Sequence, residues 1–141
     1  MTSTGGSAGL LDTNLVILLP RIIDHGPLPG APLISTITLA ELSVGPLLAS
    51  SAGERAERQA TLQQAEALFD PLPFDVNAAR AYARVSSDLR RAGRKPMARA
   101  FDALIASVAI ANGLPLYTAN PADFMGITDL QVVPVPHPDH S

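Results

Sequence analysis

Short apolar segments alternate with longer helical segments along almost the whole chain. The predicted strands are 10–11, 33–35, 114–117 and 130–135, and the predicted helices begin near residues 15, 38, 54, 75 and 101. Strands that alternate with helices usually pair in a parallel sheet, which helices cover on both faces. The pattern therefore predicts an α/β fold, rich in helix, with a central and mainly parallel sheet.

Capping residues set the expected start of the first two helices. Asp12-Thr13-Asn14 precedes the apolar run 15–19, which Pro20 is expected to disturb or end. Thr38 is the expected N-cap of the next helix, because Glu41 follows it at the spacing of a capping box. That helix is expected to reach residue 48, with a kink or an early stop at 45–46.

Two further helices have clear patterns. An amphipathic pattern predicts a helix at 54–69, whose apolar stripe includes Ala65 and Leu68. Asp75 is the expected cap of a helix that runs to Arg91 and stops at Gly93. The expected core face of this helix is Ala79, Tyr82, Ala83, Val85, Ser86 and Leu89.

The length of 141 residues suits one domain with a substantial core. We expect residues 1–8 to be a flexible lead-in, 9–135 a single domain and 136–141 a loose tail. The chain has no cysteine, which excludes disulfides, thiolate catalysis and zinc fingers. The apolar run 15–19 is too short to span a membrane and lacks a basic leader, so the expected location is the cytoplasm.

Basic side chains are concentrated in one stretch, although the formal net charge is −3. Between residues 80 and 99 the only acid is Asp88. Salt confines each charge to a range of about 8–10 Å, so a local basic face can attract phosphate on an acidic protein. A solvated helix face is the equally open alternative. The basic residues of the stretch are Arg80, Arg84, Arg90, Arg91, Arg94, Lys95 and Arg99.

Four acidic residues, Asp12, Glu41, Asp102 and Asp123, each stand where a strand or turn gives way to a helix. In parallel α/β folds, ligands collect at the carboxyl ends of the strands. Carboxylates gathered there would repel one another unless divalent cations neutralised them. Taken singly, each acid has an ordinary explanation as a cap, a first-turn acid or a turn residue.

Several other site types lack their sequence signals. The chain contains no HExxH motif, no P-loop and no GxGxxG fingerprint. Its three histidines stand in a predicted loop or in the tail, which argues against zinc and against a Ser-His-Asp triad. A phosphatase-like site with Asp12 as nucleophile would need an acid two residues later, where Asn14 stands.

The segments around the four acids resemble the motifs of the PIN-domain nucleases, in the same order. The size and the short linkers are similar to those of the VapC-type toxins of bacterial toxin–antitoxin pairs. The resemblance covers residues 10 to 124 and is carried by the segments Leu10-Leu11-Asp12-Thr13-Asn14, Ser35-Thr36-Ile37-Thr38-Leu39-Ala40-Glu41-Leu42, Phe101-Asp102-Ala103-Leu104-Ile105-Ala106-Ser107 and Thr118-Ala119-Asn120-Pro121-Ala122-Asp123-Phe124.

This resemblance implies a three-layer α/β/α sandwich and an endoribonuclease activity that depends on Mg²⁺ or Mn²⁺. It implies that Asp12 and Asp102 are the central metal ligands. Glu41 would hold a second metal or its water shell, and Asp123 would complete the acidic pocket. The residues expected to orient these ligands or bound water are Thr118, Asn120, Thr13 and Asn14.

The resemblance also implies partners. Such toxins pair with a small VapB-type antitoxin whose tail enters the acidic cleft, and they usually form homodimers. A catalytically inactive PIN-like protein-binding module is the alternative function, which the retention of all four acids disfavours. The candidates for contact with the RNA backbone are Arg90, Arg91, Arg94, Lys95 and Arg99.

Overall fold

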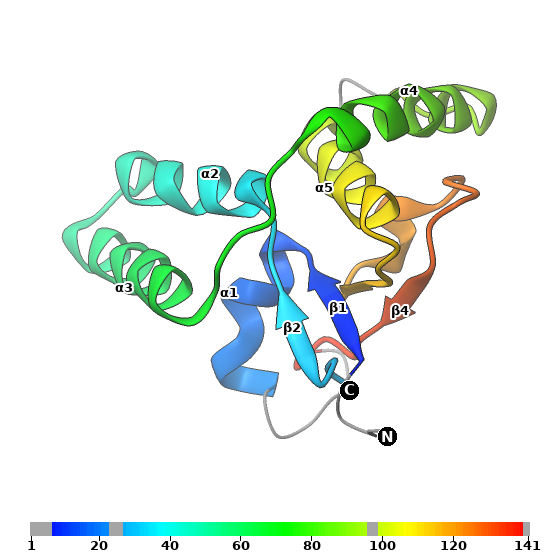
Figure 1. Cartoon of the computed structure of the whole chain (residues 1–141). Coiled ribbons are helices and arrows are strands. Elements are labelled where there is room, and N and C mark those ends of the chain that lie inside the picture. The colour runs from blue at the N-terminus through cyan, green and yellow to red at the C-terminus, as the bar shows by residue number, and fades with distance from the viewer. Residues whose placement is uncertain (1–6, 23–26, 96–98, 140–141) are drawn as a thin grey trace.

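A computed structural model describes residues 7–22, 27–95 and 99–139 (Figure 1). Within these ranges the elements are β1 (Ala8–Leu11), α1 (Thr13–Ile22), β2 (Ala31–Leu33), α2 (Thr36–Val44), the 3₁₀ turn η1 (Gly45–Leu48), α3 (Ala52–Leu68), α4 (Val76–Arg91), α5 (Ala100–Ala111), β3 (Leu116–Thr118), the 3₁₀ turn η3 (Pro121–Phe124) and β4 (Val132–Pro134). No described helix is both long and apolar enough to cross a bilayer.

The four strands form one parallel sheet in the order β2-β1-β3-β4. Leu10 of β1 pairs with Leu33 of β2 on one side and with Leu116 of β3 on the other. The chain therefore changes direction across the sheet between β1 and β3. In sheets of this kind, that switch point is where ligands bind beyond the carboxyl ends of the strands.

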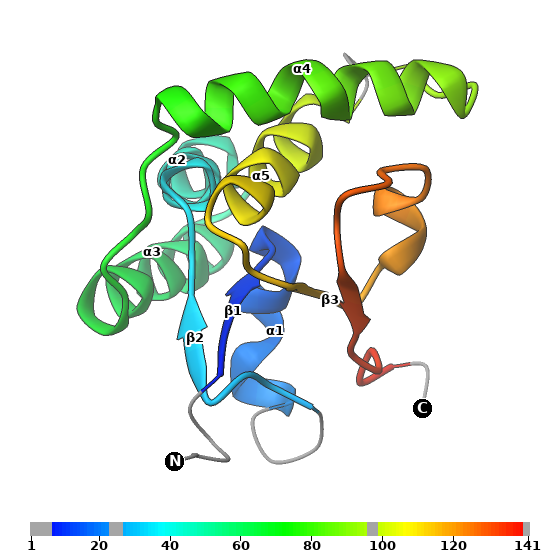
Figure 2. The same cartoon turned by 45° about the vertical axis from the view of Figure 1, so that its right-hand side comes forward.

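Successive residues of β1 face opposite layers. Leu10 packs with α4 and α5 in one core, while Leu11 packs with α1, α2 and α3 in the other. Both leucines are fully buried. Figures 1 and 2 show the two groups of helices on opposite sides of the sheet. The expected three-layer α/β/α sandwich with a parallel sheet is confirmed.

The helix caps follow the sequence prediction at one site and depart from it at another. Asp75 caps α4 as expected, because its carboxylate accepts a hydrogen bond from the Ala78 N–H at 3.0 Å. The prediction of Thr38 as the cap of α2 is wrong. Ser35 is the N-cap and accepts from the Thr38 N–H at 3.2 Å, so Thr38 lies inside the helix.

Pro20 does not end α1, which continues to Ile22. A proline lacks the N–H that would bond to the carbonyl four residues earlier, but so close to the helix end the loss affects few bonds. The predicted kink or stop at 45–46 is confirmed, because α2 ends at Val44 and η1 follows. The predicted loop that contains His25, residues 25–30, lies partly outside the described residues.

The faces of the two longer helices differ from their predicted pattern. In α4, Ala79 and Ala83 are exposed, and the alanines that reach the core are Ala78 and Ala81. Val85 and Leu89 of the expected face are buried as predicted, so the two faces overlap and differ mainly in their alanines. In α3 only Ala65 is buried, so the expected apolar stripe is mostly exposed on the described chain.

Candidate active site

Asp12 stands directly after β1, at the switch point of the sheet. Its carboxylate accepts a hydrogen bond from the Thr118 hydroxyl of β3 at 2.5 Å and another from the Leu15 N–H at 2.9 Å. Its side chain is almost completely buried. Asp12 therefore caps α1 and also points toward β3, so one residue is both a helix cap and a member of the candidate site. The Thr118 hydroxyl in turn accepts from the Asn120 N–H at 2.9 Å.

Glu41, on α2, is held by a chain of hydroxyl groups. The Thr13 hydroxyl donates to Glu41 Oε1 at 2.6 Å and lies 2.9 Å from the hydroxyl of Thr38. Because the single hydroxyl hydrogen of Thr13 is used in its bond to Glu41, Thr38 is the donor in the hydrogen bond between the two threonines. Thr38 is fully buried, which fixes this chain in place. Thr38, which the sequence predicted as the cap of α2, thus supports through Thr13 the carboxylate of Glu41 one turn later.

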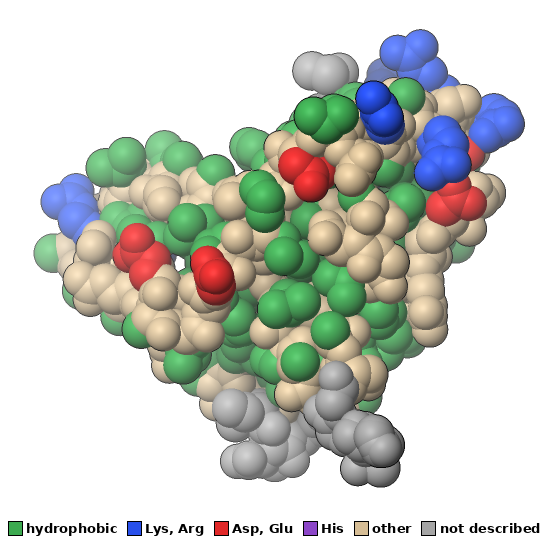
Figure 3. Space-filling model, viewed as in Figure 1, with side chains coloured by type: hydrophobic (Ala, Val, Ile, Leu, Met, Phe, Trp, Pro, Cys, Tyr) green, Lys and Arg blue, Asp and Glu red, His purple; other side chains and the backbone are tan. Residues whose placement is uncertain are grey.

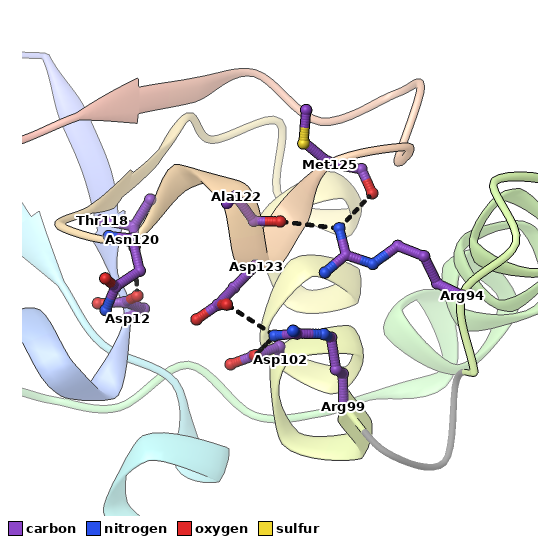
Figure 4. Close-up of polar contacts among 9 residues, drawn as sticks. All are labelled: Asp12, Arg94, Arg99, Asp102, Thr118, Asn120, Ala122, Asp123 and Met125. Atoms are coloured by element: carbon purple, nitrogen blue, oxygen red, sulfur yellow. Dashed lines mark hydrogen bonds and ion pairs between the residues drawn. The ribbon is translucent and has the colours of Figure 1, made fainter.

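Asp102 and Asp123 share a guanidinium. Arg99 Nη1 lies 2.6 Å from Asp123 Oδ1 and 3.9 Å from Asp102 Oδ2. Figure 4 shows both carboxylates directed toward this side chain, with Asp102 on α5 and Asp123 on η3. Both acids are about one-third exposed, so water still reaches them. Arg99 therefore neutralises part of the acidic charge at this end of the sheet.

The protonation of these acids reflects burial and mutual repulsion. The pKa of Asp102 is raised to about 6, first by burial and then by the charges of Asp123, Asp12 and Glu41, against a smaller opposing effect of Arg99. Burial is also the largest cause that raises the pKa of Asp12 and of Glu41, while their hydroxyl partners act in the opposite direction. The four carboxylates are thus close enough for the charges of the other three to raise the pKa of Asp102.

The donor atoms at this end of the sheet are carboxylate and hydroxyl oxygens, the ligands that Mg²⁺ and Mn²⁺ prefer. Within the three described ranges, no group of three or more acidic or histidine side chains is arranged to hold a metal ion as it stands. The candidate ligands at this end are the carboxylates of Asp12, Glu41, Asp102 and Asp123, since the charges of the other three all act on Asp102. Their assignment as ligands, and that of Thr13, Asn14, Thr118 and Asn120 as supporting residues, stays a prediction.

A pocket of about 510 Å³ opens beside Glu41, between α1, α2 and α3. Thr13 and Asn14 line it next to Glu41. Its far side includes Arg58, which donates to the Gly45 carbonyl at 2.9 Å and pairs with Glu54 at 2.6 Å. The acidic end of the sheet therefore continues into a cavity on the α2 side.

The expected RNA-contacting residues divide into two groups. Arg91 pairs with Asp88 at 2.5 Å, Arg94 donates to backbone carbonyls, and Arg99 pairs with Asp123. Arg90 and Lys95 are exposed. Figure 3 shows the basic side chains of this face gathered mainly over the α4 end of the molecule.

Sequence reasoning left out two residues of this region, Ser35 and Asp88. Asp88 is buried on α4 and accepts from the Thr128 N–H at 3.1 Å and the Thr128 hydroxyl at 2.9 Å. These bonds hold the pKa of Asp88 below its usual range. Its position, three residues after Val85 on the expected core face, is the signal that could have placed this acid there.

The fold and the acidic switch point define a PIN domain, and the chain belongs to the PIN-domain family, whose model matches residues 8–124. It is 40% identical over 118 residues to Ribonuclease VapC5 of Mycobacterium tuberculosis, across 82% of this chain and 85% of that protein. It is 32% identical over 133 residues to Ribonuclease VapC1 of Rickettsia felis, across 92% and 98%.

Comparison with a solved structure supports the same family relationship. The crystal structure of VapBC-5 from Mycobacterium tuberculosis, a member of the VapBC family of toxin–antitoxin systems, has a TM-score of 0.76 and 33% identity with this chain. The match covers 91% of this chain and 98% of that one. The resemblance to the VapC-type PIN domains is therefore confirmed.

Proposed function

We propose that the chain is a metal-dependent endoribonuclease that cleaves RNA phosphodiester bonds as the toxin of a toxin–antitoxin pair. Two relatives that share most of its length are named ribonucleases. The observation that supports this function best is the position of Asp12, held by Thr118 across the switch point with three further carboxylates around it.

In this proposal Mg²⁺ or Mn²⁺ is held chiefly by Asp12 and Asp102, with Glu41 and Asp123 completing the acidic site. The chemistry of the donors fits such a cation, and the mutual repulsion that raises the pKa of Asp102 would be relieved by it. When bound, the cation supplies activation of a water molecule and offsets charge on the scissile phosphate.

The chain's own residues orient this site. Thr118 fixes Asp12, and Thr13 fixes Glu41, each through a hydroxyl that leaves the carboxylate charge in place. Outer-sphere partners of this kind typically change metal affinity or activity by about 10–100-fold when they are removed. Arg99 limits the repulsion between Asp102 and Asp123, so a bound cation competes with this ion pair.

The proposed partner is a VapB-type antitoxin, because structures of related chains are of VapBC complexes. A basic antitoxin side chain suits the acidic end of the sheet, where the described carboxylates outnumber the single guanidinium of Arg99 in contact with them. A homodimer of the toxin is part of the same proposal.

Asp12→Asn tests the function directly. It keeps the size of the side chain but removes a buried charge, so the fold should survive and thermal stability should stay equal or rise. RNA cleavage in Mg²⁺ should fall by more than about 100-fold, the upper range for outer-sphere partners alone. The measurement is cleavage of total RNA by the purified protein, with Mg²⁺ and with chelator, and mapping of the cut ends.

Glu66→Gln is the matched control, since Glu66 is an exposed acid of α3 that does not line the pocket beside Glu41. Full activity of Asp12→Asn would refute the proposed site. Absence of cleavage by the wild-type protein, together with no heat of Mn²⁺ binding in calorimetry, would instead favour the inactive protein-binding module.

A further inference from the structure

The segment between β3 and β4 has little regular structure of its own. Residues 119–131 contain only the four-residue turn η3, and its N-cap Asn120 makes no side-chain capping bond. Asp123 lies within this turn. A single 3₁₀ turn is a weak element, because it fixes few residues for each hydrogen bond formed. The direction of the Asp123 carboxylate therefore depends on contacts from elsewhere.

The end of α4 supplies the first contact. Gly93 has a φ of +76°, and the N–H groups of Gly93 and Arg94 bond back to the carbonyls of Arg90 and Leu89 at 3.0 and 2.8 Å. This is the Schellman arrangement, which needs a residue in the left-handed region and fixes the path of the chain after the helix. The backbone of Arg94 is thereby held at a defined position.

From that position Arg94 reaches η3. Its Nη1 donates to the Ala122 carbonyl at 2.7 Å and to the Met125 carbonyl at 3.2 Å, on either side of Asp123 (Figure 4). The Ala122 carbonyl also accepts the Met125 N–H at 3.3 Å, so the guanidinium adds a charged donor to the C-terminal end of this turn, where a cation is favourable. Arg94 acts on the backbone that carries Asp123, whereas Arg99 contacts the carboxylate itself.

Two more contacts join the same part of α4 to the segment beyond η3. Asp88 accepts two hydrogen bonds from Thr128, one from its N–H and one from its hydroxyl. Gly126 has a φ of +94° and approaches Ala92 so closely that a Cβ at Gly126 would lie 2.7 Å from the Ala92 Cβ. We call these contacts of Asp88, Ala92 and Arg94 the α4 clamp.

We propose that the α4 clamp positions Asp123 for the reaction, with Arg94 as its principal positioning residue. The inference rests on the proposed function, because it assigns Asp123 to the catalytic acids. It gives Arg94 a different role from contact with the RNA backbone: its charge is directed at two carbonyls of its own chain. A phosphate would have to replace those carbonyls to bind the same nitrogen.

A double-mutant cycle separates these roles. Arg94→Ala should lower the rate of RNA cleavage by about 10–100-fold, the range for residues that orient a ligand-bearing group. In an Asp123→Asn background the same replacement should change the residual rate less than about threefold, because the group that Arg94 positions is already altered. An equal loss in both backgrounds would overturn the proposal.

A conservative replacement provides a second arm. Both hydrogen bonds of Arg94 leave from one nitrogen, so Arg94→Lys, whose ammonium is also a single donor atom, should restore activity to within about tenfold of wild type. Arg55→Ala, at an exposed position of α3, is the control and should leave cleavage unchanged. Failure of the lysine to rescue would also contradict the proposed mode of action.

Amide hydrogen exchange tests the clamp without any catalytic activity. The N–H groups of Asp123 and Met125 bond within η3 to Asn120 and Ala122. In Arg94→Ala they should exchange about ten times faster, as expected for the loss of a charged hydrogen bond, while the Leu10 amide of β1 stays protected. Unchanged exchange at Asp123 and Met125 would overturn the inference even if cleavage falls.

The two hypotheses fail in different ways. If the wild-type protein does not cleave RNA, the proposed function fails and the exchange rates alone decide whether the clamp holds η3. If the wild-type protein cleaves RNA and Arg94→Ala cleaves equally well, the proposed function stands and the positioning role of Arg94 is refuted.

Discussion

The two sides of the sheet hold their acidic residues in different ways. On the α2 side, Glu41 accepts a hydrogen bond from the Thr13 hydroxyl and pairs with no basic side chain of the described residues. On the α5 side, Asp102 and Asp123 both lie near Arg99. A hydroxyl orients a carboxylate without cancelling its charge, whereas a guanidinium does both. Glu41 is therefore oriented by a neutral hydroxyl, while Asp102 and Asp123 are already paired with a cation.

The packing of the two sides differs as well. The core between α4, α5 and the sheet includes Leu89, Ile105 and Phe124, all with at most 2% exposure. On the other side, α3 buries only Ala65, and Leu68 is 64% exposed. Regions with few buried apolar contacts open at lower free energy than the rest of a fold. The contrast indicates a firm α4–α5 half and a more weakly attached α3.

The largest predicted effect comes from truncating one leucine on each side. Leu89→Ala leaves a cavity in the firm core and should lower the free energy of unfolding by about 2–5 kcal/mol. Leu68→Ala, at an exposed position, should change it by about 0.5 kcal/mol or less. Urea denaturation followed by circular dichroism measures both. Similar losses in the two variants would show that α3 is packed as firmly as α4.

A smaller effect is expected from pH, since the native pKa of Asp102 is raised to about 6. A raised pKa means that the native state binds the proton more tightly than the unfolded chain does, whose aspartates titrate near 4. In chelator, stability should therefore increase as the pH falls from 7.5 through 6 toward 4. With its one-third exposure, we expect a gain on the order of 1 kcal/mol.

Asp102→Asn should remove much of this dependence, and Glu41→Gln should remove less, because burial and the charges of three other acids act together on Asp102. Thermal melting at a series of pH values compares the variants. A wild-type protein that loses stability between pH 7.5 and 5, in step with Asp102→Asn, would contradict the assigned repulsion among the acids.

The smallest predicted effect concerns RNA binding on the firm side. Arg90 and Lys95 are exposed. Arg91 is exposed too, but it pairs with Asp88, and Arg94 and Arg99 also have intramolecular partners. If each contacts one phosphate, Arg90→Gln or Lys95→Gln should each reduce the slope of log Kd against log salt by about 0.7 for single-stranded RNA. Fluorescence anisotropy in the Asp12→Asn background measures the slope, with Arg55→Gln as control. Unchanged slopes would leave the basic stretch as a solvated face.

Roles that depend only on partners a few residues away in the chain, such as helix capping, were predictable from the sequence. The spacing of Asp75 before an apolar helical face indicated its capping role correctly. Ser35 and Thr38 were harder to separate, because both are capping types three residues apart and Glu41 follows Thr38 at a capping-box interval. Both side chains are fully buried, and the hydrogen bonds distinguish them: Ser35 accepts from the Thr38 N–H, whereas the Thr38 hydroxyl bonds to Thr13.

Features that depend on distant partners could not be predicted. Nothing local to Arg94 indicates that its guanidinium reaches carbonyls 28 and 31 residues away. Similarly, the pattern of α3 looked amphipathic, but burial also requires a facing surface: Ala65 is buried, Leu62 is only partly buried, and Leu68 is 64% exposed. The four acids were identifiable because each begins or adjoins a helix at the same edge of a predictable sheet.

The described chain begins and ends at the edge of the sheet opposite the acids. The Ser7 carbonyl accepts from the Ala31 N–H at the start of β1 and β2, and Asp139 pairs with Arg21 in the last turn of α1. Helix α1 runs ten residues back from Asp12, which corresponds to about 15 Å (Figure 1). The described chain therefore enters the fold at Ser7 and leaves it at Asp139 on the side remote from the proposed catalytic centre, and a purification handle joined beyond either residue starts from that side.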